Sequence, residues 1–117
     1  MIDPGSFAEI RSMYEKHGWV LRRVLLSAAS KTIRAELFDS VAADIPILDS
    51  TIDAAWFSRP PTGGPVAWEV RYLGIMPFAL LETVDESSVD FEADLRAIEV
   101  RLQESVAAKN RLDNGKG

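Results

Sequence analysis

The sequence predicts an α+β fold, in which helices pack on one face of a mostly antiparallel, four-stranded sheet and form a two-layer sandwich with it. Apolar residues recur at helical spacing near both ends of the chain. The middle instead holds runs rich in β-branched and aromatic residues, which Gly- and Pro-rich turns separate. The expected order is α-β-α-β-β-β-α, and the 117 residues fit a single domain.

A helix over residues 7–17 opens the predicted fold, because Ser6 and Glu9 form a capping box before an apolar stripe. Gly18 follows it and suits the position after a helix C-terminus. Residues 19–27 come next and are dense in Val, Leu and Trp, which is the composition of a half-buried strand.

A second helix is expected after this strand, with Ser30 as its N-cap. Ile33, Leu37 and Val41 share one face of it at a spacing of four residues. Pro46 ends the helix, since proline disfavours helical geometry in the residue before it.

The clearest β signal is a three-stranded meander over residues 52–59, 66–73 and 78–84. Its first two strands flank a loop rich in Gly and Pro, which indicates a hairpin. The last helix begins at Ser87 or Ser88. Its apolar stripe at helical spacing is formed by Phe91, Leu95, Ile98, Leu102 and Val106.

The composition excludes several kinds of site. Without cysteine, the chain has no disulfide, no thiol nucleophile and no Cys-based zinc or iron–sulfur site. Its single histidine, His17, excludes a metal site built from several histidines of one chain. The net charge of −5 argues against nucleic acid as a partner, because phosphate binding needs a surface rich in Lys and Arg. We assign no cofactor, no metal and no catalytic residue.

The ends of the chain carry no signal for a membrane or for export. Residues 1–6 contain an acid rather than a basic start, and no apolar run of about 18–20 residues is present, so neither a signal peptide nor a membrane span is expected. The expected compartment is the cytoplasm. Residues 1–6 resemble a vector-derived leader, and residues 111–117 are expected to be the frayed tail of a single domain over 1–117.

One pattern of charged residues in the meander indicates a metal-dependent site. Asp53 lies near the start of one strand, and Glu69 and Arg71 share a face of the next. This order resembles the PD-(D/E)xK nucleases, and the resemblance implies two carboxylates that hold Mg²⁺ beside a basic residue that positions water. Arginine stands at the lysine position and never deprotonates, so it activates water poorly. The alternative is cross-strand ion pairing among Arg59, Glu69 and Arg71 on a solvated sheet face.

Aromatic residues gather in the same meander. Trp56 and Phe57 are adjacent in a strand, so they must face opposite sides of the sheet. One enters the core beneath the helices, and the other lies with Asp53 and Arg59 on what we term the second face of the meander, opposite the helices. An aromatic flanked by charge there is typical of an interface or a ligand platform, unless a loop or a second copy of the chain covers it.

Arg22 and Arg23 interrupt the otherwise apolar first strand. Alternation places one on each face, so we expect at least one to pair with a carboxylate across the sheet, such as Glu69 or Glu82. The alternative is an arginine that binds an anion in a cleft on the sheet.

Two hypotheses for the function follow. In the first, a small bacterial-type domain acts by binding, to itself as a homodimer or to another protein, through the second face of the meander. In the second, a small-molecule site or enzyme uses a cleft between the sheet and the second helix. Its polar groups would come from Arg22 or Arg23, Asp53, Arg59, Glu69 and Arg71, and the nuclease-like trio is one form of it. No nucleophile–base pair is evident, which favours binding over catalysis.

Overall fold

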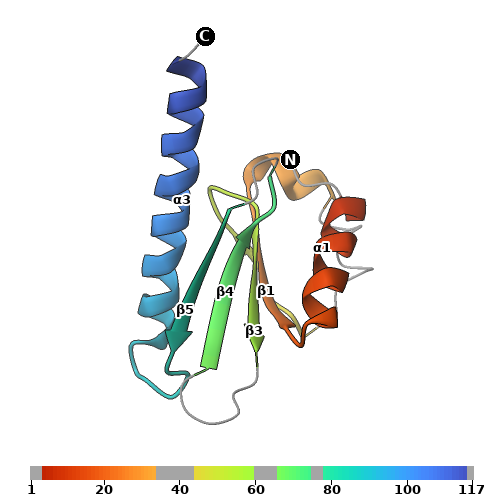
Figure 1. Cartoon of the computed structure of the whole chain (residues 1–117), viewed down its shortest axis with the longest axis vertical. Coiled ribbons are helices and arrows are strands. Elements are labelled where there is room, and N and C mark those ends of the chain that lie inside the picture. The colour runs from red at the N-terminus through yellow and green to blue at the C-terminus, as the bar shows by residue number, and fades with distance from the viewer. Residues whose placement is uncertain (1–3, 34–43, 60–65, 75–77, 116–117) are drawn as a thin grey trace.

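The chain forms a five-stranded sheet with a helix on each side. The computed structural model describes residues 4–33, 44–59, 66–74 and 78–115. Figure 1 shows α1 and α3 on opposite sides of the strands. The elements in chain order are α1 (Pro4–Lys16), β1 (Val20–Leu26), the 3₁₀ helix η1 (Ala28–Ile33), β2 (Ile47–Asp49), β3 (Ala54–Arg59), β4 (Val66–Tyr72), β5 (Ala79–Val84) and α3 (Phe91–Gly115).

The sheet has the order β2-β1-β3-β4-β5, in which β1 and β2 are parallel and the other neighbours are antiparallel. The predicted α+β class and the meander of β3, β4 and β5 are confirmed. The predicted count of four strands is wrong, because β2 adds a fifth. This strand is only three residues long, too short to show a period of two in the sequence.

The predicted second helix is replaced in part by η1, which covers residues 28–33. The remaining residues expected in that helix, including Leu37 and Val41, lie outside the residues that the structure describes. Ser30 is fully buried within η1. Its backbone N–H donates to the Ser27 carbonyl at 3.0 Å, which is the tight turn of a 3₁₀ start.

The expectation that all helices cover one face of the sheet is wrong. On β3, Trp56 packs in a core cluster with α3, whereas Phe57 packs in a separate cluster with α1. The reason is visible in the burial of this strand, where five consecutive residues are buried and no side is left for solvent. A strand whose side chains are apolar on both faces of the sheet must be covered on both faces.

The helix α1 covers the sheet over β1 and β3. Phe7 is buried in the cluster beneath it, and Ile10 and Tyr14 pack against the same cluster. Gly18 ends the helix with a positive φ of 87°, and its N–H donates to the Glu15 carbonyl at 3.0 Å. This left-handed residue allows the chain to turn directly into β1.

The helix α3 packs mainly on β4 and β5. A turn leads into it, in which the Asp90 N–H donates to the Ser88 hydroxyl at 3.1 Å, and the helix itself begins at Phe91, three residues after the predicted cap. The helix continues to Gly115, into the segment 111–117 that was expected to be frayed, and it runs beyond the end of the sheet in Figure 1. Its buried stripe is formed by Leu95, Ile98, Leu102 and Val106.

In the described part of the chain, no helix combines the length and the apolar character that a membrane span requires.

Candidate functional site

The structure divides the eight predicted site residues between the two faces of the sheet. The face toward α3 carries Arg22, Arg23 and Trp56. Strand alternation and the pairing of β3 with β4 place the other five on the face toward α1, which is the second face of the meander: Asp53, Phe57, Arg59, Glu69 and Arg71.

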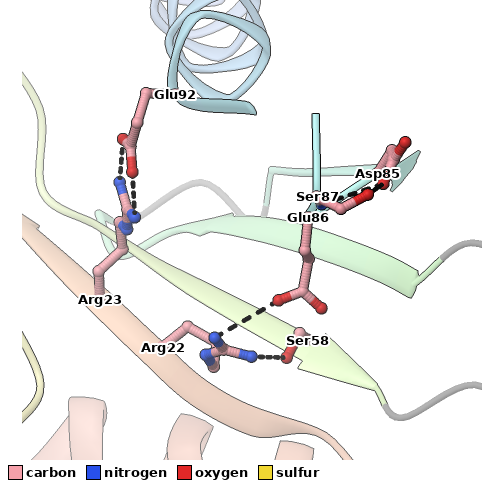
Figure 2. A network of polar contacts seen from close by, with 7 residues as sticks. All are labelled: Arg22, Arg23, Ser58, Asp85, Glu86, Ser87 and Glu92. Atoms are coloured by element: carbon pink, nitrogen blue, oxygen red, sulfur yellow. Dashed lines mark hydrogen bonds and ion pairs between the residues drawn. The ribbon is translucent and has the colours of Figure 1, made fainter. Parts of the chain in front are cut away.

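Arg22 and Arg23 lie on the same face, so the expectation of one on each face is wrong. The pairing of β1 with β3 shifts between Leu21 and Arg23, so Arg22 is the extra residue of a β-bulge. A bulge adds one residue without a partner and resets the alternation of the strand. Both guanidinium groups therefore lie on this face, where Arg23 reaches Glu92 of α3 and Arg22 lies between Ser58 and Glu86 (Figure 2).

The partners of the two arginines are not the predicted Glu69 or Glu82. The two Nη atoms of Arg23 lie 3.0 Å from the two carboxylate oxygens of Glu92, in the first turn of α3 (Figure 2). Arg22 donates to the Ser58 hydroxyl at 3.1 Å and lies 3.5 Å from Glu86, ahead of α3. A sequence pattern within the sheet does not point to Glu86 or Glu92, because both carboxylates come from the chain beyond the last strand.

A half-open groove of about 540 Å³ lies along the first half of β1, where β2 does not reach. The Arg22 guanidinium forms part of this groove and stacks over the Trp68 ring, 4.9 Å from its centre. The remaining lining comes from Arg11 and Glu15 of α1, Val20, Leu21, Arg23, residues 44–46 and Phe91.

The charges in this groove are largely compensated. Arg11 lies 2.9 Å from Glu15 within α1, and the two β1 arginines have the carboxylate partners described above. The hydrogen bond from Arg23 lowers the pKa of Glu92, so this pair stays ionised to lower pH. A ligand in the groove would have to compete with these carboxylates for the guanidinium groups.

The nuclease-like trio does not converge on one site. Asp53 accepts a hydrogen bond from the Ser27 N–H at 2.8 Å and is buried beside that turn. Its backbone pairs with Leu73, four residues along β4 from Glu69. Four residues of strand span about 13 Å, too far for two carboxylates to share an ion. Among the described residues, no group of three histidines or acids is placed to hold a metal.

The two adjacent aromatics of β3 are both covered by the chain itself. Trp56 is fully buried under α3, and its indole N–H donates to Glu99 at 2.8 Å. Phe57 is fully buried under α1 and stacks on Tyr14, with ring centres 4.1 Å apart. Neither ring forms an exposed platform.

Beyond the reach of Tyr14, the second face becomes progressively more open. The hydroxyl of Tyr14 donates to Glu69, and burial together with this bond raises the pKa of Tyr14. Glu69 and Arg71 on β4 are half-buried, whereas the next strand is exposed on this face. Leu81 of β5, directly opposite Glu69, is 59 % exposed.

The outer side of β5 is an open hydrogen-bonding edge in the part of the chain that the structure describes. The Tyr72 N–H donates to the Phe78 carbonyl at 2.8 Å. This bond shows which residues of β5 direct their backbone groups toward β4, namely Phe78 and every second residue after it. In an antiparallel ladder alternate residues bond to the same neighbour. Ala79, Leu81 and Thr83 therefore direct their N–H and C=O groups away from β4.

We call Ala79, Leu81 and Thr83, with the exposed face they share, the β5 edge. The sequence pattern does not reveal it, since Leu81 is one more apolar residue of a predicted strand. The position of this strand at the end of the meander could have indicated it, because the last strand of a meander can form the edge of a sheet.

Compared with known proteins, the chain matches no family model, and neither a curated protein nor a solved structure gives a significant match.

Proposed function

We propose that this chain is a binding module and that its β5 edge takes up an extended strand from a partner. The observation that carries the proposal is the coincidence, among the described residues, of backbone groups directed away from β4 with an exposed apolar side chain at Leu81. Strand addition of this kind draws affinity from main-chain hydrogen bonds and specificity from alternate side chains.

The β5 edge lacks the features by which sheet edges usually resist pairing. The strand β5 has the sequence Ala-Leu-Leu-Glu-Thr-Val, which contains no lysine, no proline and one charge. That charge, Glu82, belongs to the α3 face and forms an ion pair with Arg101 at 2.7 Å. No charge on the open face of β5 therefore opposes an incoming strand.

A peptide titration tests the proposal. The probe is a synthetic peptide with the sequence of residues 78–84 between terminal lysines, added to the ¹⁵N-labelled chain. We expect shifts and slowed hydrogen exchange at the amides of Ala79, Leu81 and Thr83. Leu81→Lys should abolish these changes, because a lysine on an edge strand disfavours pairing. Val100→Lys is the matched control, since Val100 is also an exposed apolar residue but lies on α3.

Binding of the peptide elsewhere, or no change at these three amides at millimolar peptide although they exchange freely in the chain alone, would contradict the proposed function.

A second candidate function is small-anion binding in the groove beside β1. The observation that favours it is that one groove of suitable size, within the roughly 300–1,000 Å³ of ligand sites, touches both Arg22 and Arg23. Titration with inorganic phosphate tests it: binding should be weakened by Arg22→Gln and unaffected by Arg59→Gln. Equal responses of the two variants would exclude the groove as the site.

A further inference from the structure

We infer that the partner strand is β5 of a second copy of this chain, paired antiparallel about a two-fold axis that passes beside Leu81. The inference rests on the proposed function of the β5 edge and names its occupant. It is argued from the register in which two copies of β5 can pair with each other.

Symmetry restricts that register. A two-fold axis perpendicular to the sheet keeps each side chain on its own face of the sheet. Odd-numbered residues of β5 must therefore lie opposite odd-numbered residues of the second copy, and even-numbered opposite even-numbered. With Leu81 at the axis, Leu81 meets Leu81 of the second copy, and Ala79 meets Thr83. These are the residues whose backbone groups point outward, so each of these pairs can exchange two hydrogen bonds.

The neighbouring symmetric registers are less favourable. An axis at Glu82 would set Glu82 against Glu82 of the second copy at the closer, non-hydrogen-bonded spacing, where like charges repel. An axis at Leu80 leaves Thr83 and Val84 without partners among residues 78–84. The Leu81 register pairs every residue from Phe78 to Val84 and opposes Glu82 with Leu80. It also buries the Leu81 side chain, which is 59 % exposed in the single chain.

The helices suit the same arrangement. Because α3 packs on β4 and β5, the axis would bring the two α3 helices antiparallel on one face of a continuous ten-stranded sheet. With strands about 4.8 Å apart, the helix axes would lie about 10 Å from each other, close to the usual spacing of packed helices.

The side of α3 toward the axis is marked by Arg101, which reaches Glu82 on β5. One helical turn away on that side lies Ala97, which is exposed and small. Arg101 is thus already paired within each copy. Asp94 and Glu104, two further exposed acids of α3, lie three residues from Ala97 and from Arg101. Each copy carries a net charge of −5, so the two copies repel one another, and added salt screens this repulsion.

Cysteine scanning tests the register, since the chain contains no cysteine of its own. Opposed residues of a hydrogen-bonded antiparallel pair have Cα atoms about 5.5 Å apart, within the range of a disulfide. We expect Leu81→Cys to form a disulfide-linked dimer under mild oxidation. Thr83→Cys alone should stay monomeric on a denaturing gel, whereas a mixture of Ala79→Cys and Thr83→Cys should give the mixed dimer. Val100→Cys is the control for random collision.

Light scattering coupled to size exclusion completes the test. We expect a dimer for the wild-type chain, favoured by added salt, and a monomer for Leu81→Lys with its circular dichroism unchanged. Three results would overturn the inference: Thr83→Cys cross-linking as fast as Leu81→Cys, a dimer that survives Leu81→Lys, or a monomer at every concentration. A monomer that still binds the β5 peptide leaves the proposed function standing, whereas a monomer that does not bind it contradicts both.

Discussion

Arg23 and Glu92 join β1 to the first turn of α3 by two parallel contacts of 3.0 Å each. The Arg23 side chain is 15 % exposed, whereas that of Glu92 is 66 % exposed. The two-point geometry suits the planar guanidinium and orients both groups. This pair therefore fixes the point at which α3 meets the sheet, at the border between core and solvent.

We expect Glu92→Gln to lower the free energy of unfolding by about 0.5–1 kcal/mol, a value kept small because solvent screens the exposed carboxylate. Urea unfolding of Arg23→Gln, Glu92→Gln and the double variant measures the coupling between the two groups. Asp94→Asn is the control, because Asp94 is an acid in the same first turn of α3. A coupling energy of zero would show that the contact does not stabilise the fold.

The same pair predicts a pH dependence. The Arg23 hydrogen bond lowers the pKa of Glu92 below its ordinary value of 4.5. Its contribution is therefore present above pH 4.5 and is lost as the pH falls through the lowered folded value. The difference in unfolding free energy between wild type and Glu92→Gln should shrink as the pH falls below the ordinary value of 4.5 and through the lowered folded value. A difference that grows on acidification would contradict this assignment.

Loss of the hydrogen bond to the buried indole of Trp56 should lower the stability more than loss of the Arg23–Glu92 pair. Its N–H donates to Glu99 at 2.8 Å while the ring is fully buried. Glu99→Ala leaves this donor without a partner and should cost about 1–3 kcal/mol, whereas Glu99→Gln keeps an acceptor and should cost less. Glu104→Ala, at an exposed position of the same helix, should change stability little. Thermal and urea unfolding of the three variants check the order.

The sequence was sufficient to predict most of the fold, because helices and meander strands are set by local periodicity. The stripe from Leu95 to Val106 and the alternation of β4 both appear in the structure as expected. The placement of the helices was not predictable in the same way. The adjacent burial of Trp56 and Phe57 requires cover on both faces, and the identity of that cover depends on contacts distant in the chain.

The site was less accessible to prediction for a related reason. The bulge at Arg22 arises from the pairing of β1 with β3, so no local pattern in β1 reveals it. The carboxylate partners Glu86 and Glu92 lie beyond the last strand, so the alternation of side chains along the strands does not point to them. Leu81 was predicted to be in a strand, but its exposure follows from strand order, which the sequence left undecided.

Tyr14 predicts a loss of stability at alkaline pH. Burial and the hydrogen bond to Glu69 raise the pKa of its phenol above the ordinary value of 10.0. Its contribution is therefore complete below pH 10 and is lost as the pH rises toward the raised folded value, because the unfolded chain ionises first.

We expect Tyr14→Phe to be less stable than wild type at neutral pH by about 0.5–1.5 kcal/mol, since it keeps the stack on Phe57 and loses the hydrogen bond. Above about pH 10 the two proteins should converge. Urea unfolding across this range measures both effects. Parallel curves at all pH values would show that Tyr14 ionises alike in the folded and unfolded chain.

Gly18 predicts a purely backbone effect at the end of α1. Its φ of 87° lies in the left-handed region, and a Cβ added there would have Arg59 Nε 3.9 Å away as its nearest neighbour, so space is available. Gly18→Ala should therefore cost about 1–2 kcal/mol through conformation alone. Gly5→Ala is the matched control, because Gly5 lies within α1, where alanine is the better helix former and should be neutral or stabilising. Equal effects of the two substitutions in thermal unfolding would mean that the turn at Gly18 does not require a left-handed residue.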